Sequence, residues 1–586
     1  MWHLEEGLQI GANFVEICYD KLTGHENVLL FSIDIVDSQS VKELPRILSL
    51  DKSSVSEMVK KTSTKLLNAF VDLAFQFVDQ ELIPSQGNFA PVEEIGGRVA
   101  VATIEGKIPH NFPEGVYIRN GSNPHFGARK IAKSIFGKSS DIWVEGEGML
   151  HALYFSKDTN GTWNISYNNR YVETETLKLE KERNKPAFLP ATEGDSLAVL
   201  SAILLNTWRF GVPNKILSNT NIFEHSGKYY TISENHMPQE VDISTLETLG
   251  DWELTKSWNR NFTSHPKRTP YSGELVIVGV DGQKPYFEVG VLSADGKKIK
   301  TRVDLNYSRC TICHEIGVTE KYNVITDFPL VVDINRLFKG GSLIKFEKEQ
   351  FARIGVMPRY GDANSIRWFD VTACSVFHLF NSYEDDDEVV VRGCQARGSV
   401  IPGPELGLNK FEWFSKGFKQ IKSADDTSNE DSEEGILFAR AYEWRLSMKT
   451  GQVKEKYLTG NEFAMDMPFI NETYTGLKSK YGYTHVVDSI ASSNAGIVKY
   501  GGLAKLYFDE IDCENFALVG AFEEDDGWII SFIHDEDTNK SEAYIIDAKK
   551  FSRKPVARIT LPSRVPYGFH GTFASTNSDK KRNLMC

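Results

Sequence analysis

Residues 527-GWIISFIHDEDTNKSEAYIIDAKKFSRKPVARITLP-562 contain three short apolar segments that follow one another along the chain. The segments are 527-GWIISFIHDE-536, 541-SEAYIIDAKK-550 and 555-PVARITLP-562. Polar residues typical of turns separate them, with one turn about every ten residues. This pattern predicts three strands of an antiparallel meander.

Segments of the same kind recur from Asn88 to the C-terminus, for example 273-GELVIVGVD-281 and 323-NVITDFPLVVD-333. Strands do not alternate with helices, so a parallel sheet is disfavoured. Several hundred residues of meander can form a sandwich, a barrel or a propeller. We predict an all-β fold and favour the propeller, because so many strands in one domain must protect their edges.

The composition is that of a large globular protein. Hydrophobic residues make up 41% and charged residues 25% of the 586 residues, which allows a large core. The formal net charge is −14, and no cluster of Lys and Arg interleaved with aromatic residues could follow a phosphate backbone. Nucleic acid is therefore excluded as an expected partner, and the lack of a long apolar run excludes a transmembrane helix.

The chain divides into three predicted parts. Residues 1–52 have weak periodicity and are an N-terminal extension of uncertain order. An amphipathic helix is predicted over residues 53–84. Apolar residues recur there at three- and four-residue steps over 55–82, and Pro84 ends the pattern. This helix either packs on the domain or lies on a membrane surface. Residues 85–586 are predicted to form a single β domain.

The compartment is not readable from a targeting signal. The N-terminal residues show neither the basic-then-apolar order of a secretory signal nor the Arg- and Ser-rich composition of a transit peptide. Seven cysteines at irregular spacing do not form a disulfide framework and fit a reducing compartment.

Four of the thirteen histidines stand in settings that differ from the rest: His265 at a strand terminus, His314 just before a strand, His378 in an apolar stretch, and His570 between glycine and aromatic residues. Taken singly, each is more often a buried structural histidine than a ligand. Their separations of 49, 64 and 192 residues exclude local zinc patterns. A shared site would have to be assembled from distant strands, as at the axis of a propeller.

A set of ordered motifs resembles those of the plant carotenoid cleavage dioxygenases, the family of retinal pigment epithelial membrane protein-like enzymes. The motifs are GNFAPVEE (87–94), IRNGSNPHF (118–126), VEGEGMLHALYF (144–155), SHPK (264–267), CHEIGVT (313–319), FHLFNSYED (377–385), EEDDGWIISFIHDE (523–536) and RVPYGFHGTF (564–573). Within the family, YGGLAKLYFDE (500–510) and the Trp of EEDDGW resemble the zaxinone synthase-like subgroup.

The resemblance implies a seven-bladed β-propeller with a helical and loop cap over an axial iron site. His265, His314, His378 and His570 fall on the motif positions of the four ligands of Fe(2+). The implied activity is oxidative cleavage by O2 of a conjugated double bond in a carotenoid or apocarotenoid, giving two carbonyl products. The implied location is the plastid, in the stroma or at a membrane, with the cytoplasm as the alternative.

The family orients its ligand histidines through glutamates that accept a hydrogen bond from the outer ring nitrogen. The resemblance places the first on Glu234 and the second on Asp466, which is an aspartate here. Because Asp466 is one methylene shorter, we expect a longer or water-bridged contact. The third falls in 500–523, where a Gly-Gly-Glu pattern reads Gly501-Gly502-Leu503, and it cannot be placed.

Other readings remain open. Cys310-Thr-Ile-Cys313-His314 matches the signature of c-type haem attachment, which is disfavoured because no export signal precedes it. The altered carboxylates allow a catalytically silent propeller that binds apocarotenoids or a protein partner. The same scaffold also serves related isomerases and stilbene-cleaving oxygenases.

Overall fold

The computed structural model describes residues 64–79, 87–127, 130–142, 144–254, 258–399, 410–421, 435–508, 524–576 and 584–585. Residues Phe70–Cys586 form one compact unit. The N-terminal extension 1–52 lies outside the described residues.

Seven sheets of three to five strands follow one another along the described part of the chain, and we call them blades 1 to 7. Blade 1 is β35 (Gly571–Ser575), β4 (Gly115–Ser122), β7 (Gly148–Lys157), β8 (Trp163–Tyr171) and β2 (Val99–Ala100). Blade 2 is β10 (Asn221–His225), β11 (Lys228–Ile232), β12 (Gln239–Val241) and β13 (Thr248–Asp251). Blade 3 is β14 (Lys267–Arg268), β15 (Leu275–Val280), β16 (Phe287–Leu292) and β17 (Ile299–Asp304).

The remaining blades continue this order. Blade 4 is β19 (Gly317–Val318), β20 (Tyr322–Asp327), β23 (Ala352–Pro358) and β24 (Arg367–Val371). Blade 5 is β25 (Ser375–Asp385), β26 (Glu388–Ala396), β27 (Arg440–Ser447) and β28 (Val453–Tyr457), and blade 6 is β29 (Ala464–Phe469), β30 (Tyr481–Val487) and β31 (Tyr500–Tyr507). Blade 7 is β32 (Trp528–Asp535), β33 (Lys540–Asp547), β34 (Ala557–Thr560) and β3 (Ile104–Gly106), with β36 (Leu584–Met585) parallel to β32.

The blades close into a ring. Each pair of neighbouring blades shares its own cluster of buried apolar side chains, and this includes blades 7 and 1. The strands are rich in β-branched and aromatic residues, which suit pleated surfaces covered on both faces. The fold is therefore the predicted seven-bladed β-propeller, and the quoted segments 527–536, 541–550 and 555–562 form β32, β33 and β34.

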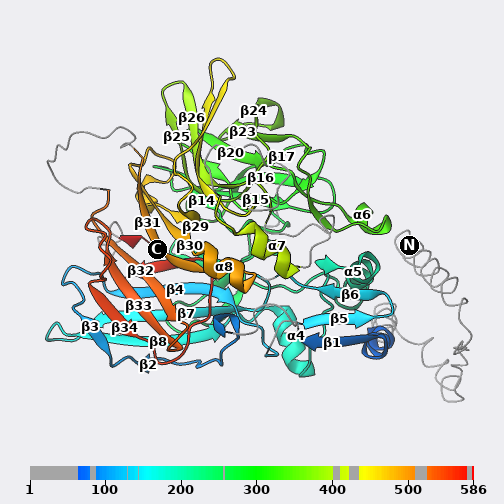
Figure 1. Cartoon of the computed structure of the whole chain (residues 1–586), viewed down its shortest axis with the longest axis horizontal. Helices are drawn as coiled ribbons and strands as arrows, with labels where there is room; N and C mark the ends of the chain where they lie inside the picture. Colours follow the sequence, from blue (N-terminus) through cyan, green and yellow to red (C-terminus); the bar gives the residue numbers. More distant parts are fainter. Residues whose placement is uncertain are drawn as a thin grey trace, which may run out of the picture. The chain divides into compact units, whose positions relative to one another are not determined.

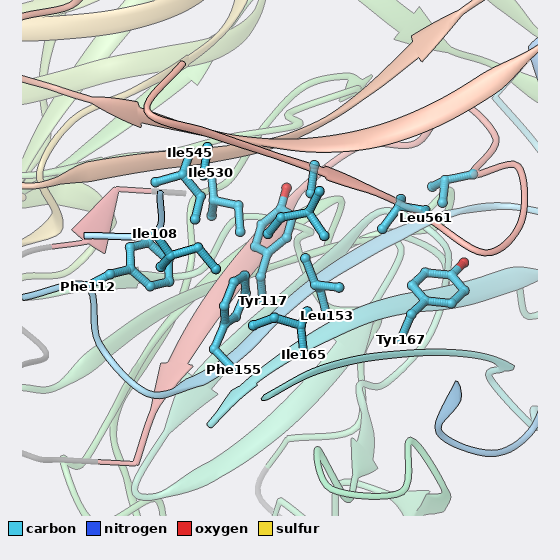
Figure 2. Close-up of a cluster of buried hydrophobic side chains, with 14 residues drawn as sticks. Ile108, Phe112, Tyr117, Leu153, Phe155, Ile165, Tyr167, Ile530, Ile545 and Leu561 are labelled. Atoms are coloured by element: carbon cyan, nitrogen blue, oxygen red, sulfur yellow. The ribbon is translucent and has the colours of Figure 1, made fainter. Parts of the chain in front are cut away.

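The ends of the chain close the ring together. β3 pairs with β34, with Ile104 opposite Ile559, and Figure 1 shows the blue β3 beside the orange β34. β35 pairs with β4 in the same way in blade 1. Figure 2 shows the cluster between these two blades, in which Tyr117 and Leu153 from blade 1 face Ile530 and Ile545 from blade 7.

The hairpin between β10 and β11 illustrates the local chemistry of the turns. His225 pairs with Lys228, so that only Ser226 and Gly227 form the connection. Both have positive φ angles, 55° and 80°, as a two-residue turn of type I′ requires. Short turns of this kind let consecutive strands of a blade pair directly.

The predicted helix over 55–82 is wrong at its C-terminal end. Residues 64–74 are helical, residues 55–63 lie outside the described part, and Phe75–Asp79 form the strand β1. β1 pairs with β5 (Lys130–Ser134) along its whole length. The sequence FQFVD suits a strand, and pairing with a distant segment outweighs the helical periodicity.

The elements outside the blades form the cap. β1 precedes the first blade strand in the chain, and the others are inserted between successive blade strands. They comprise the sheet of β1, β5, β6 (Gly137–Ser140) and β9 (Glu193–Gly194), the sheet of β18 (Cys310–Thr311), β21 (Leu330–Val332) and β22 (Ile344–Phe346), and the helices α4 (Glu175–Arg183), α5 (Ser196–Phe210), α6 (Ile334–Phe338), α7 (Lys410–Gly417) and α8 (Ser489–Ala495). Figure 1 shows α5 next to β6. No described helix is both long and apolar enough to span a bilayer.

Candidate metal centre

Four histidines from four blades meet at one point. His265 precedes β14, His314 precedes β19, His378 lies on β25 and His570 precedes β35. Each of these strands is the end strand of its sheet. One ring nitrogen from each histidine lies within 4.8 Å of the others. The four sheet ends therefore surround a common axis, and the predicted candidate residues come together there.

The ring nitrogens converge closely. The Nε2 atoms of His265 and His314 are 3.1 Å apart, and those of His314 and His378 are 3.2 Å apart. The ring centroids of His265 and His570 are 4.3 Å apart. Imidazoles in this arrangement can direct several lone pairs at one cation.

The surroundings of His265 and His570 keep their imidazole rings neutral, so that each ring has a nitrogen lone pair for a metal ion. Burial, together with the neighbouring histidines, lowers the pKa of His265 and of His570 well below the usual value. Both rings are therefore neutral near pH 7. The Nε2 atom of His570 is buried without a hydrogen-bond partner. A buried imidazole nitrogen without a partner is costly in a purely structural cluster and fits a metal-binding one.

Two carboxylates hold the outer nitrogens. His314 donates its Nδ1–H to Glu234, which follows β11. Burial alone would lower the pKa of His314, but Glu234 outweighs it and raises the pKa above the usual value. His378 donates its Nδ1–H to Asp466 Oδ1 at 2.8 Å. Such contacts fix the tautomer and leave Nε2 facing inward.

The expectation of a longer or water-bridged contact for Asp466 is wrong. The β29–β30 ladder shifts register between Asp466 and Phe469, and Met467 has a positive φ of 57°. This bulge re-aims the shorter side chain toward His378. Burial raises the pKa of Asp466, but His378 and the Met467 N–H outweigh burial, so the pKa lies below the usual value and the carboxylate is ionised.

Among the described residues, no third carboxylate accepts a hydrogen bond from the outer ring nitrogen of one of the four histidines. Leu503 lies opposite His485 in the β30–β31 ladder, and within the described ranges no carboxylate is hydrogen-bonded to His570. Residues 509–523 lie outside those ranges. His570 thus differs from His314 and His378 in what holds its ring.

The haem reading of the Cys310–His314 segment is not supported by the structure. Both cysteines are buried thiols. Cys313 donates to the carbonyl of Glu315 at 3.4 Å, and burial raises its pKa to about 12. A buried protonated thiol is an inert packing residue.

Sequence reasoning missed Glu315, which is buried beside the cluster. Its only signal is a charged residue directly after His314 in a segment that is otherwise apolar. Its contacts are with residues far along the chain, as described below.

The model of the retinal pigment epithelial membrane protein family matches residues 89–575. The chain belongs to this family. Its members include the carotenoid cleavage dioxygenases, and the family is iron-dependent. The four-imidazole donor set described above fits iron.

Curated relatives in this family cover most of the chain. Carotenoid 9,10(9′,10′)-cleavage dioxygenase 1 of Pisum sativum is 32% identical over 83% of this chain and 89% of that protein. A chloroplastic 9-cis-epoxycarotenoid dioxygenase of Arabidopsis thaliana is 29% identical over 91% of this chain and 87% of that protein.

Solved structures share the fold. Lignostilbene dioxygenase of Pseudomonas brassicacearum superposes with a TM-score of 0.65 at 21% identity, covering 85% of this chain and 99% of that protein. A variant of Synechocystis apocarotenoid oxygenase superposes with a TM-score of 0.64 at 17% identity, covering 83% and 98%. At these identities the likeness concerns the propeller alone.

Proposed function

We propose that this chain is a non-haem iron(II) dioxygenase that cleaves a conjugated double bond of a carotenoid or apocarotenoid with O2 to give two carbonyl products. The observation that carries the proposal is the convergence of His265, His314, His378 and His570 within 4.8 Å. The chain's relatives include carotenoid cleavage dioxygenases, which supports the substrate class.

The proposed ligand set contains no carboxylate, so Fe(2+) bound there would keep its full positive charge and supply the binding and activation of O2. The protein's own residues do the rest. Glu234 and Asp466 hold the rings of His314 and His378 in one tautomer. Neither is assigned a proton-transfer role, since splitting an alkene into two carbonyls with O2 needs little proton transfer.

The substrate must be held by apolar contacts, because a polyene offers almost no hydrogen-bonding groups. Phe377 stands next to the ligands, with its ring centroid 5.5 Å from that of His314. We assign it to the wall against which the polyene packs. The likeness to the zaxinone synthase-like subgroup stays a prediction.

Purified protein tests the proposal. We expect about one iron per chain and conversion of at least one member of a carotenoid and apocarotenoid panel to two carbonyl products, detected by mass spectrometry. His378→Ala is expected to lose both iron and product. His225→Ala is the matched control, because His225 is buried in blade 2 and its ring bonds the Ser293 carbonyl within the described part of the chain. Equal iron loss in both variants would contradict the proposal.

The absence of a described carboxylate behind His570 keeps a silent binding propeller as the second candidate. Iron-replete protein that binds apocarotenoids but yields no product with any polyene would favour it. Incubation with ¹⁸O2 separates the remaining alternatives, since an isomerase leaves its product unlabelled, and a stilbene panel tests the stilbene-cleaving reading.

We further propose a plastid location and contact with a membrane surface. Three relatives carry chloroplastic names, which supports the location, and a fluorescent fusion in plant cells tests it against the cytoplasm. Leu73 in the helix 64–74 is 79% exposed and supports membrane contact. Leu73→Asp is expected to weaken sedimentation with lipid vesicles, and unchanged sedimentation would exclude this helix as the contact.

A further inference from the structure

The buried carboxylate of Glu315 lies between the chain segments that carry His265, His314 and His378. Its Oε2 accepts the Leu379 N–H at 2.6 Å, and its Oε1 forms an ion pair with Lys267. Its backbone pairs with that of His265 in an isolated parallel bridge. The residue is 6% exposed, so these contacts are largely shielded from water.

Each of these contacts lies beside a proposed ligand. Glu315 directly follows His314, Leu379 directly follows His378, and Lys267 is two residues beyond His265. One side chain therefore joins the inner edges of blades 3, 4 and 5. Glu234 and Asp466 act differently, because each touches a ligand ring directly.

The regular sheet ladders do not fix these three positions. His265 precedes β14, which pairs with β15 at only two positions. The β25–β26 ladder shifts register on both sides of Leu379, so His378 has no cross-strand partner. His314 lies between β18 and β19 and belongs to neither strand. The contacts of Glu315 supply the constraint that the ladders leave out.

We infer that Glu315 is a positioning residue of the metal centre, which holds the backbones of His265, His314 and His378 at the spacing that a shared metal ion requires. The inference rests on the proposed function. Replacing the carboxylate by a neutral amide leaves Lys267 without its ion-pair partner and gives the Leu379 N–H a weaker, uncharged acceptor, so the three histidines are held less firmly.

Cobalt(II) tests the inference without activity as a readout. The full-length chain, stripped of metal and loaded with Co(2+), is measured for its visible absorption spectrum, which reports ligand geometry, and for its cobalt dissociation constant by chelator competition. The variants are Glu315→Gln and Lys267→Met. The matched control is Asp525→Asn, which breaks a buried ion pair with Lys505 whose side chains are 2% and 5% exposed.

We expect Glu315→Gln to change the cobalt spectrum and to weaken cobalt binding by about tenfold, in the range typical for residues that support metal ligands. Lys267→Met is expected to act in the same direction and less strongly. Adding it to Glu315→Gln is expected to have little further effect, because both changes remove one shared ion pair. Asp525→Asn is expected to lower the unfolding temperature and to leave the spectrum unchanged.

The outcomes separate the inference from the proposed function. Wild-type protein that binds no cobalt would overturn both. Wild-type binding with an unchanged spectrum and affinity in Glu315→Gln would overturn the inference alone, as would the same spectral change in Asp525→Asn. Should Glu315→Gln fail to fold, Lys267→Met decides, since Lys267 is only partly buried and a wild-type spectrum in that variant overturns the inference.

Discussion

His378 donates its Nδ1–H to Asp466 Oδ1 across 2.8 Å, although the two residues are 88 positions apart in the chain. Asp466 also accepts the Met467 N–H at 2.8 Å, and Thr484 donates to the Asp466 carbonyl at 2.8 Å. The aspartate is thus held on both its side chain and its backbone. A bulge in β29 directs this shorter side chain toward His378, so that its carboxylate contacts the ring directly.

Asp466→Ala is expected to weaken iron binding by about 10- to 100-fold, because His378 loses the acceptor that fixes its tautomer. Chelator competition under anaerobic conditions measures the dissociation constant. Glu462→Ala is the control, since Glu462 is an exposed carboxylate just before β29. Tight iron binding that persists in Asp466→Ala would show that the contact does not support the ligand.

Removal of the metal is expected to lower the unfolding temperature, because an ion bound by His265, His314, His378 and His570 links four blades and stabilises only the folded state. Thermal unfolding of iron-loaded and chelator-treated protein measures the difference. The same treatment is expected to leave the unfolding temperature of His378→Ala unchanged. Equal shifts in wild type and variant would mean that the chelator acts elsewhere.

Ile545→Ala is expected to destabilise the ring closure. Ile545 is fully buried in the cluster between blades 7 and 1, and truncation of such a residue costs about 2–5 kcal/mol. Denaturant unfolding followed by tryptophan fluorescence measures the loss. Ile135→Ala, at a position that is 74% exposed, is expected to change little. A similar small effect in both variants would argue against this cluster as the closing contact.

Stability is expected to fall as the pH falls from 6.5 toward 4, partly through His236. Burial lowers the pKa of His236 from 6.5 to about 4 in the folded state, so the unfolded chain takes up a proton first. The contribution of the neutral ring is complete above pH 6.5 and is lost as the pH approaches 4. Thermal unfolding across this range is expected to show a shallower decline for His236→Gln. Parallel curves would assign the acid sensitivity to other groups.

Much of the fold was predictable from local patterns. The segments that became β32, β33 and β34 are apolar, evenly spaced and separated by turn residues, and these features depend only on neighbouring residues. The prediction was wrong at Phe75–Asp79. The apolar residues there have helical periodicity, but the segment is a strand that pairs with β5. Local propensity is weak there, and the distant pairing decides the conformation.

The candidate site divides in the same way. His265, His314, His378 and His570 stand out by residue type and by motif, and the structure brings them together. Glu315 did not stand out, because its partners Lys267 and Leu379 are distant in the chain and only folding makes them neighbours.

The amino-acid sequence alone identifies the strands, the four histidines and the family resemblance, because strand periodicity and motif order are properties of consecutive residues. The contact of Glu234 with His314, the direct reach of Asp466 and the anchoring by Glu315 depend on the folded structure. Those features rest on hydrogen bonds between residues 64 to 88 positions apart, and such contacts exist only once the blades have closed around their axis.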